Sequence, residues 1–276
     1  MLLHLGPISL YWYGLLIALG FVIAVGLTMR LAQREGLDSD RVLSAALVAT
    51  LIGLLTARIY FIATTNPGYY LNPKHMSEAL SLATSGLSYF GGVVGVVLGA
   101  WVYCSRYGLP LPRILDLAAV SAPLGQAVGR LGNLLNGDVQ GRLTRGFGIE
   151  YTNPRNPFLG PDRLGQTAHS VALYEMVYDV LLFAGLWVLY RRQKPDQRAP
   201  GLLAAVYLAG YSVGRLFIAA YEVGPAAALG LRQVQLAALV GFAVALALIL
   251  SDRFPRTSPP VAQAAEVGEV EEQPAT

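Results

Sequence analysis

Charged side chains are scarce in this chain. Asp, Glu, Lys and Arg make up 13% of its 276 residues, while hydrophobic residues make up 54%. Ordinary soluble domains contain about 25% charged residues, so these proportions exclude a typical soluble protein. The formal net charge is only +3, and the cationic residues flank apolar stretches, so we expect no nucleic acid as a partner.

Cysteine and familiar catalytic motifs are scarce as well. Cys104 stands alone, so no disulfide can form within the chain, and its apolar surroundings favour a packing role over a reactive thiol. The sequence contains no P-loop, no zinc-ligand spacing and no Gly-x-Ser-x-Gly elbow. His169 is the only histidine near the polar residues described below, and a single histidine cannot form a metal site. We therefore predict no metal.

Long apolar stretches dominate the rest of the chain. Seven of them are long enough for a bilayer, which a helix crosses in roughly 20 residues. Each must be helical because lipid offers no partner to a free backbone amide. The first has no cationic start and no small-residue cleavage site, so we interpret it as a retained helix. The stretches are residues 8–29, 43–63, 87–105, 114–135, 170–190, 202–221 and 233–251. They predict an all-α, polytopic membrane protein with about seven transmembrane helices.

Cationic residues predict how these helices are oriented. They gather after the first, third, fifth and seventh stretches, as the positive-inside rule expects of cytoplasmic segments. These residues are Arg30, Arg34, Arg41, Arg106, Arg113, Arg191, Arg192, Lys194, Arg198, Arg253 and Arg256. The N-terminus is then outside and the C-terminus cytoplasmic.

The domain organisation follows from the same pattern. We expect a single transmembrane domain over residues 1–252, with an outer loop near 137–169. Residues 253–276 combine Pro, Ala and Glu with little apolar content, which predicts a disordered cytoplasmic tail.

Three arginines, Arg58, Arg130 and Arg215, lie inside apolar stretches. A guanidinium inside a bilayer costs at least about 3 kcal/mol, so it almost always meets an anion. Arg58 is near the outer end of its stretch and suits either a ligand contact or an anchor that reaches the interface. Arg215 is central in its stretch, and Tyr211 precedes it by one turn on the same face. We therefore favour a functional role for Arg215.

Polar residues around Arg130 strengthen the case for a ligand. Arg130, Asn133 and Gly137 are spaced i, i+3 and i+7, which places them on one helical face. A guanidinium beside a carboxamide suits a phosphate oxygen or an acyl carbonyl, and Gly132 and Gly137 would let a head group approach the backbone. The structural alternative ties Arg130 to Asp116 or to carbonyl groups at a helix end.

Internal counter-ions are the main alternative to a ligand. Glu175 and Asp179 lie one turn apart in the fifth stretch and would neutralise one or two arginines. Glycines at small-xxx-small spacing, such as Gly91, Gly95 and Gly99, predict close helix packing.

Cations and amides around a glycine-lined cavity near the outer leaflet suit an anionic lipid head group. The side chains of Arg130 and Arg215 are expected to converge on such a pocket. Residue chemistry alone leaves two functions open, a lipid-modifying enzyme and an anion transporter. Transporters commonly show internal repeats, and we find no convincing repeat between the halves.

The segment around Arg130 also resembles a family signature. Residues 129–141 read Gly-Arg-Leu-Gly-Asn-Leu-Leu-Asn-Gly-Asp-Val-Gln-Gly, which is similar to the signature of prolipoprotein diacylglyceryl transferases. Further pieces resemble the family in the same order along the chain. They are Gly6 to Ile8 with Trp12 to Leu15, Ala57 to Tyr60, Ser88 to Gly95, His169 with Leu173 to Glu175, and Gly210-Tyr211 with Arg215.

The resemblance implies a reaction without a metal or organic cofactor. Such enzymes move the diacylglyceryl group of phosphatidylglycerol onto the lipobox cysteine thiol in the signal peptide of a prolipoprotein, and glycerol 1-phosphate leaves. They act in the bacterial cytoplasmic (inner) membrane. Arg130 and Arg215 would then bind the phosphate, and Asn133 would orient the glyceryl portion.

The remaining site residues follow from the same resemblance. Tyr13 or His169 would accept the proton, and Asp138 would support the loop or Arg142. Gly137, Gly141, Arg58 and Tyr211 complete the expected substrate-binding set.

Several positions depart from the family pattern. Phe90 replaces a His or Tyr that could move a proton, and Asp138 replaces a Glu. Ala219 and Glu222 stand where the family often has Glu and Arg. These departures keep two alternatives open: a divergent paralogue that is non-catalytic or has another acceptor, and a membrane protein that binds or transports anionic lipid.

Overall fold

The computed structural model describes residues 3–5, 8–10, 12–70, 72–80, 86–152, 160–194 and 198–251. The chain divides into two compact units. The first unit comprises Met1–Leu31 with Leu115–Thr276, and the second comprises Ala32–Ile114. The expected tail, residues 253–276, lies outside the described residues, and the single domain over 1–252 stays a prediction.

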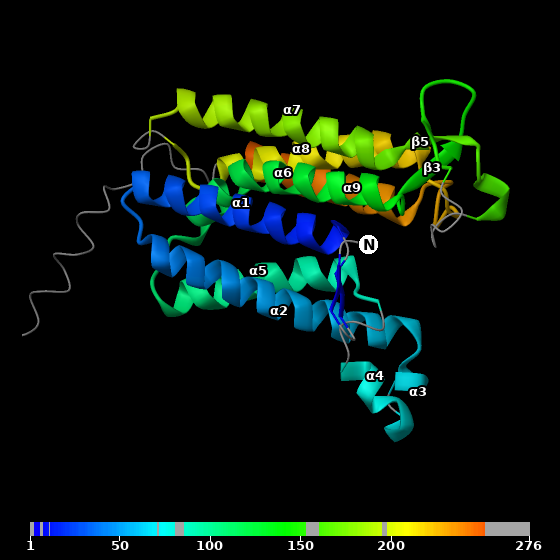
Figure 1. Cartoon of the computed structure of the whole chain (residues 1–276). Helices are drawn as coiled ribbons and strands as arrows, with labels where there is room; N and C mark the ends of the chain where they lie inside the picture. The colour runs from blue at the N-terminus through cyan, green and yellow to red at the C-terminus, as the bar shows by residue number, and fades with distance from the viewer. Residues whose placement is uncertain are drawn as a thin grey trace, which may run out of the picture. The chain divides into compact units, whose positions relative to one another are not determined.

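The second unit is built on a long helix pair, α2 (Ser39–Thr65) and α5 (Tyr89–Arg106). The two run side by side along most of their length (Figure 1). Glycines make this possible: a Cβ on Gly95 would lie 2.9 Å from Gly53 Cα, and one on Gly99 would lie 2.8 Å from Ala49 Cα. The predicted packing role of these glycines is confirmed. Short helices α3 (Pro67–Tyr70), η1 (Pro73–His75) and α4 (Met76–Leu80) follow α2.

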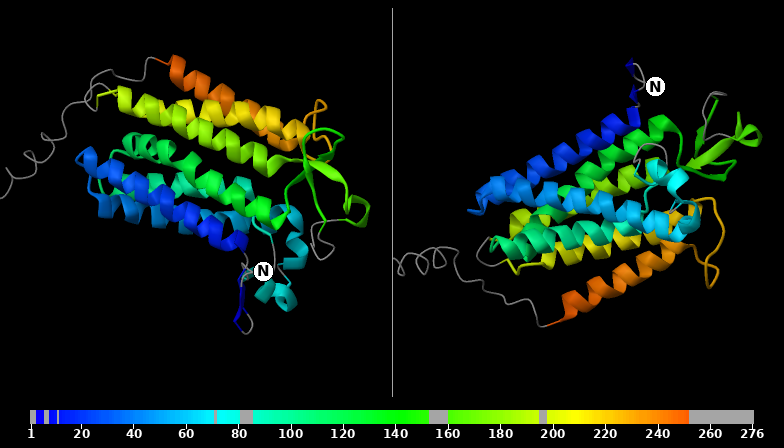
Figure 2. Two further views of the ribbon diagram at one scale, coloured as in Figure 1. Left: turned by 45° about the horizontal axis from the view of Figure 1, so that its top comes forward. Right: turned by 90° about the horizontal axis from the view of Figure 1, so that it is seen from below.

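The first unit contains most of the remaining helices. They are α1 (Trp12–Arg34), α6 (Leu111–Asn136), α7 (Val171–Arg192), α8 (Leu202–Ile218), the short η4 (Ala219–Tyr221) and α9 (Gln233–Leu250). The ends of α1 and α6 nearest residues 32–114 belong to the second unit. Figure 2 shows α7, α8 and α9 side by side.

Two contacts hold α6 against its neighbours in this unit. A Cβ on Gly125 of α6 would lie 2.6 Å from the carbonyl oxygen of Gly20 on α1, so the two backbones meet without side chains between them. Asp116 of α6 caps the start of α8, where its Oδ2 accepts from the Gly201 amide at 2.6 Å and its Oδ1 from the Ala204 amide at 2.8 Å. These bonds satisfy amides that a helix leaves unpaired at its first turn.

Each predicted apolar stretch corresponds to a helix. Within the described residues, five helical segments are long and apolar enough to cross a membrane: Trp12–Arg34, Ser39–Thr65, Val171–Arg192, Leu202–Tyr221 and Gln233–Leu250. The expected seven spans and the orientation of the termini stay predictions.

Short strands correct the purely helical expectation. Residues Ile8–Leu10 were expected in the first span, but they form β2, which pairs with β1 (Leu3–Leu5). The expected outer loop carries an antiparallel sheet in the order β3 (Gln140–Leu143), β5 (Thr167–Ser170) and β4 (Ile149–Glu150). A short helix, η2 (Pro161–Arg163), precedes β5. Strands of two to four residues are too short to show a readable alternation.

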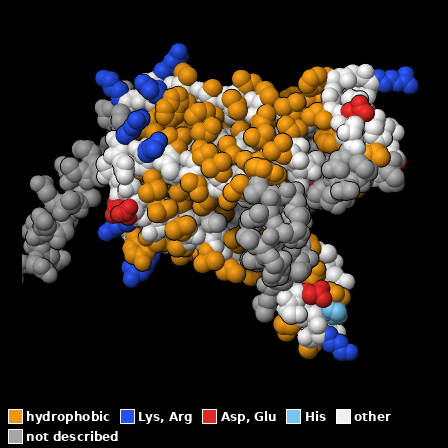
Figure 3. Space-filling view, viewed as in Figure 1, with side chains coloured by type: hydrophobic (Ala, Val, Ile, Leu, Met, Phe, Trp, Pro, Cys, Tyr) orange, Lys and Arg blue, Asp and Glu red, His pale blue; other side chains and the backbone are white. Residues whose placement is uncertain are grey.

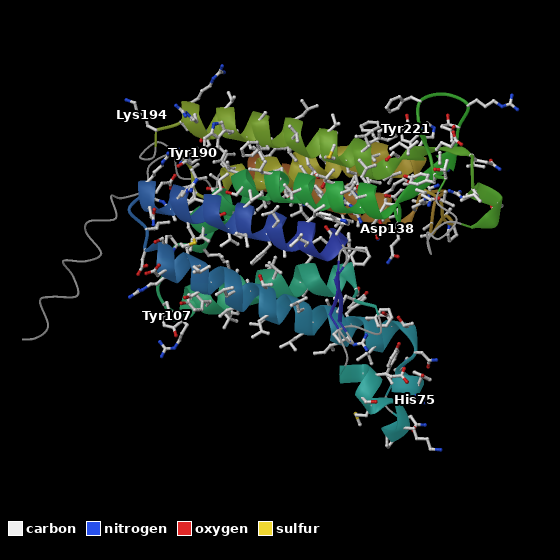
Figure 4. All side chains as sticks on the ribbon, in the orientation of Figure 1. His75, Tyr107, Asp138, Tyr190, Lys194 and Tyr221 are labelled. Atoms are coloured by element: carbon white, nitrogen blue, oxygen red, sulfur yellow. The ribbon has the colours of Figure 1, made fainter. Side chains whose placement is uncertain are left out.

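The two ends of the first unit differ in the side chains that they carry. Lys194 and Tyr190 mark the end where α7 finishes, and Asp138 and Tyr221 mark the end that carries the sheet (Figure 4). Lys and Arg side chains gather where α7 ends, while hydrophobic side chains cover the helices (Figure 3). Arg198 also closes that end of α7, donating to the carbonyls of Tyr190 and Gln193 at 3.0 Å each.

Candidate active site

Arg130 of α6 and Arg215 of α8 meet on one carboxylate. Arg130 Nε lies 2.9 Å from Glu175 Oε2, and Arg215 Nη1 is paired with Glu175 Oε1. Glu175 lies one turn into α7, and its side chain is 4% exposed. The predicted counter-ion role of Glu175 is therefore confirmed. The structural alternative that tied Arg130 to Asp116 is wrong, because Asp116 caps α8.

A second carboxylate also pairs with Arg215. Arg215 Nη2 lies 2.9 Å from Glu222 Oε1, at the end of the segment that follows α8. The space beside these groups is a cavity of about 10 Å³, room for roughly one water molecule. Its lining consists of Arg130, Glu175, Tyr178, Asp179, Tyr211, Gly214, Arg215 and Ile218. The expected convergence of the two arginines is confirmed, but an open head-group pocket between them is absent from this part of the structure.

The loop after α6 is organised around Asp138. Its carboxylate accepts from Asn133 Nδ2 at 3.1 Å and from Asn136 Nδ2 at 3.1 Å. Gly137 ends the helix with φ of +70° and donates its amide to the Asn133 carbonyl at 2.8 Å. Only glycine adopts this left-handed conformation at little cost. The predicted support of the loop by Asp138 is confirmed, but Gly137 lies beyond the helix and not on the face of Arg130.

The tyrosine Tyr151 belongs to the same loop. Burial raises the pKa of its hydroxyl, and the negative charge of Asp138 raises it further, while a hydrogen bond with Ser170 lowers it. The hydroxyl therefore stays protonated at neutral pH and serves as a hydrogen-bonding group.

Gly132 and Tyr13 belong to the contact between α1 and α6. A Cβ on Gly132 would lie 3.2 Å from Leu16 Cβ and 3.4 Å from Tyr13 Cα. The expectation that Gly132 leaves room for a head group is therefore wrong, because α1 fills that space. Tyr13 stands in the first turn of α1, at the end of α6 that carries Asn133.

Gly141 lies where three backbone segments cross. It pairs with Glu222 in an isolated β-bridge and follows Gln140, which pairs with Ser170 of β5. A Cβ on Gly141 would lie 2.7 Å from the carbonyl oxygens of both His169 and Tyr221. A packing requirement therefore explains this glycine without any ligand.

His169 belongs to an aromatic cluster at the start of α7. Its Nδ1 lies 2.9 Å from the Tyr174 hydroxyl, which also points to the Phe147 carbonyl at 3.4 Å. The His169 ring is 4.7 Å from that of Tyr221, measured between centroids. The neighbouring Ser170 caps α7, where its hydroxyl accepts from the Leu173 amide. Residues 169–174 thus fix the position of the His169 ring and begin the helix that carries Glu175.

The chain is similar to known proteins along most of its length. The family model for prolipoprotein diacylglyceryl transferase matches residues 1–251. Among relatives named phosphatidylglycerol–prolipoprotein diacylglyceryl transferase, that of Clostridioides difficile (strain 630) is 31% identical over 85% of this chain and 87% of its own length. Those of Parasynechococcus marenigrum (strain WH8102) and Nostoc sp. (strain PCC 7120) are 34% and 33% identical, over 81% and 89% of this chain and 80% and 86% of their own lengths.

The chain belongs to the prolipoprotein diacylglyceryl transferase family. The resemblance predicted from residues 129–141 is confirmed. As a member of this family with several membrane-length apolar helices, the protein is a multi-pass membrane enzyme, a transferase of lipoprotein biosynthesis.

Arg58 is the one predicted site residue of this transferase that lies in the second unit. It is 5% exposed, and its guanidinium donates to three backbone carbonyls: those of Ala79 at 2.9 Å, Gly86 at 2.9 Å and Glu78. The rings of Phe61 and Tyr70 lie 5.5 and 5.4 Å from its Cζ. These contacts hold the connection between α2 and α5 and explain why Arg58 is buried. Substrate binding by Arg58 and an anchor at the membrane interface both stay predictions.

Sequence reasoning missed three contributors to the site of this transferase. Asn136 donates a hydrogen bond to Asp138, Tyr178 lines the cavity, and Glu222 forms an ion pair with Arg215. The spacing of Gly210 and Gly214 is the sequence feature that relates to Tyr178. Its ring fills the space that Gly214 leaves open, and its hydroxyl donates to the Gly210 carbonyl at 2.6 Å. Glu222 was noted as a departure from the family pattern, but its partner depends on the bend after α8.

Proposed function

We propose that this enzyme transfers the diacylglyceryl group of phosphatidylglycerol to the lipobox cysteine thiol of a prolipoprotein. The observation that carries the proposal is the meeting of Arg130 and Arg215 on Glu175. A guanidinium pair that holds a carboxylate also suits a phosphate, since both anions accept paired N–H donors. The relatives named above carry phosphatidylglycerol and prolipoprotein in their names.

The reaction exchanges one bond for another at the glyceryl carbon. The substrate sulfur forms a carbon–sulfur bond, the carbon–oxygen bond to the phosphate breaks, and glycerol 1-phosphate leaves with the bonding electron pair. The thiol proton passes to a base. Negative charge grows on the departing phosphate, so Arg130 and Arg215 lower the barrier by stabilising that charge. Because the nucleophile belongs to the acceptor, the reaction needs no thiol from Cys104.

We assign proton acceptance to His169, whose ring lies in the aromatic cluster at the start of α7. When the Tyr174 hydroxyl donates to the Phe147 carbonyl, it accepts from His169 Nδ1, and proton acceptance from the thiol is then assigned to Nε2. Tyr13 remains the alternative base. We assign Asn133 to the glyceryl portion of the donor, where its carboxamide would exchange its bond to Asp138 for one to the lipid.

The proposal places the protein in the bacterial inner membrane with seven spans. The N-terminus is outside, because the cationic residues follow alternate helices. The sheet-bearing end of the first unit then faces outward, where a secreted prolipoprotein presents its lipobox.

Mass spectrometry of a lipobox peptide tests this function. Purified protein is incubated with the peptide in vesicles that contain phosphatidylglycerol, and we expect a thioether-linked diacylglyceryl product together with glycerol 1-phosphate. Vesicles with phosphatidylcholine as the only lipid serve as the control and should yield no product. Absence of product beside an active relative such as the Clostridioides difficile protein would overturn the proposal and favour a non-catalytic lipid-binding role.

A further inference from the structure

Arg215 holds two carboxylates of different accessibility. Its Nη1 is paired with Glu175, whose side chain is 4% exposed, and its Nη2 with Glu222, whose side chain is 20% exposed. Glu175 also pairs with Arg130. Displacing Glu175 would therefore disturb both arginines, whereas displacing Glu222 would remove a partner from Nη2 of Arg215 and leave Arg130 unchanged.

The backbone holds Glu222 at this position. Its β-bridge to Gly141 ties it to β3, and the Glu222 amide donates to the Ala219 carbonyl at 3.2 Å. Arg232, which precedes α9, donates to the same Ala219 carbonyl. The carboxylate is thus presented to Arg215 by an ordered turn.

We propose that Glu222 is an internal competing anion: its carboxylate pairs with Nη2 of Arg215 until the phosphate of the lipid donor displaces it. The inference rests on the function proposed above and adds how the affinity for the donor is set. The cavity beside the cluster has room for about one water molecule, so a phosphate needs a position that a side chain now fills. Glu222 is the more exposed of the two anions on Arg215, and its departure leaves the pair between Arg130 and Glu175 intact.

The exchange has a defined energetic consequence. The gain from binding phosphate is reduced by the loss of the contact between Arg215 and Glu222, and the displaced carboxylate still repels the bound anion. The donor therefore binds less tightly than two arginines alone would allow. Loosely held substrate also means easier release of glycerol 1-phosphate, which carries the same phosphate.

Substitution of Glu222 tests the inference in the full-length enzyme. Glu222→Gln keeps the size of the side chain and removes its charge, and Glu222→Ala removes both. We expect the KM for phosphatidylglycerol and the inhibition constant of glycerol 1-phosphate to fall about three- to tenfold in both variants, with kcat changed less than about twofold. A structural role would act in the opposite direction, raising KM or lowering thermal stability.

Glu150→Gln is the matched control. Glu150 is an exposed carboxylate on β4 of the same unit. Its substitution changes the net charge by the same amount and leaves the pair between Glu222 and Arg215 in place. It should leave both constants unchanged. A drop of equal size in Glu150→Gln, or unchanged or weaker binding in both Glu222 variants, overturns the inference.

Direct binding separates this inference from the proposed function. Calorimetric titration with glycerol 1-phosphate measures affinity whether or not transfer occurs. A wild-type protein that forms no thioether contradicts the proposed reaction, while tighter phosphate binding by Glu222→Gln in the same preparation still supports the competing anion.

Discussion

Arg58 in the second unit and Arg215 in the first are both buried arginines, but their partners differ in kind. Arg58 donates to three backbone carbonyls, whereas Arg215 is paired with two carboxylates. A backbone carbonyl cannot leave without unfolding its segment, but a carboxylate side chain can be exchanged for another anion. The same residue type therefore holds backbone carbonyls in one unit and pairs with side-chain anions in the other.

The largest expected effect comes from removing the shared anion of the first unit. Glu175→Gln leaves Arg130 and Arg215 without their common partner, and breaking such a buried pair costs about 3 kcal/mol of unfolding free energy. We expect transfer activity to fall at least about a hundredfold, because both guanidinium groups lose their alignment. Denaturant unfolding in detergent and the lipobox assay measure the two effects. Wild-type activity in this variant would show that the alignment does not depend on Glu175.

Replacing the anchor of the second unit should separate stability from activity. Arg58→Lys loses the planar fork that reaches three carbonyls, and we expect a loss of about 2 kcal/mol in unfolding free energy. The kcat of the folded fraction should stay within about twofold of wild type. Unchanged stability with a large rise in the KM for phosphatidylglycerol would instead establish Arg58 as a substrate-binding residue.

A phosphate-bearing ligand should distinguish the two arginines directly. Glycerol 1-phosphate at ten times its Kd should stabilise the wild-type protein by about 1.4 kcal/mol through mass action. Arg58→Lys should keep this increment, and Arg215→Lys should lose most of it. Thermal unfolding with and without the ligand provides the measurement. Equal increments in both variants would mean that phosphate binds elsewhere.

The smallest expected effect concerns the Glu78 side chain. Arg58 uses the backbone carbonyl of Glu78, and the contacts of the carboxylate with Tyr69 and His75 are exposed, so Glu78→Gln should change the unfolding free energy by less than about 1 kcal/mol. A loss as large as that in Arg58→Lys would show that Arg58 depends on the carboxylate, and the contrast with Arg215 would disappear.

The same substitution has a predicted effect on titration. A hydrogen bond to the Glu78 carboxylate is the main cause that raises the pKa of Tyr69, with further contributions from burial and from the charge of Glu78. The contact therefore stabilises the fold fully below the ordinary tyrosine pKa of about 10 and is lost as the pH rises through the folded value. In Glu78→Gln the pKa of Tyr69 should move back toward the ordinary value, as measured by NMR against Tyr69→Phe.

Much of the site was predictable because its residues are charged and lie in apolar stretches of sequence. Arg130 and Arg215 stand out as charges inside apolar stretches, and Glu175 stands out for the same reason. The positions of Gly132 and Gly137 were harder to judge. Glycine serves close packing, a left-handed turn and ligand access equally well, and only the neighbouring helix and the end of α6 decide among them.

The strands and the partner of Glu222 could not be read from local patterns. β3 and β5 are separated by more than twenty residues and pair over four residues or fewer. Their pairing depends on the path of the intervening chain. Glu222 meets Arg215 because the chain bends after α8 and pairs with Gly141.

The sequence by itself determined the helical membrane class, the family and the identity of the charged residues, since apolar length and a buried charge have consequences that hold in any fold. Only the tertiary structure decided which partner each arginine meets. That choice depends on distances of a few ångströms between helices far apart in the chain, and no local spacing records them.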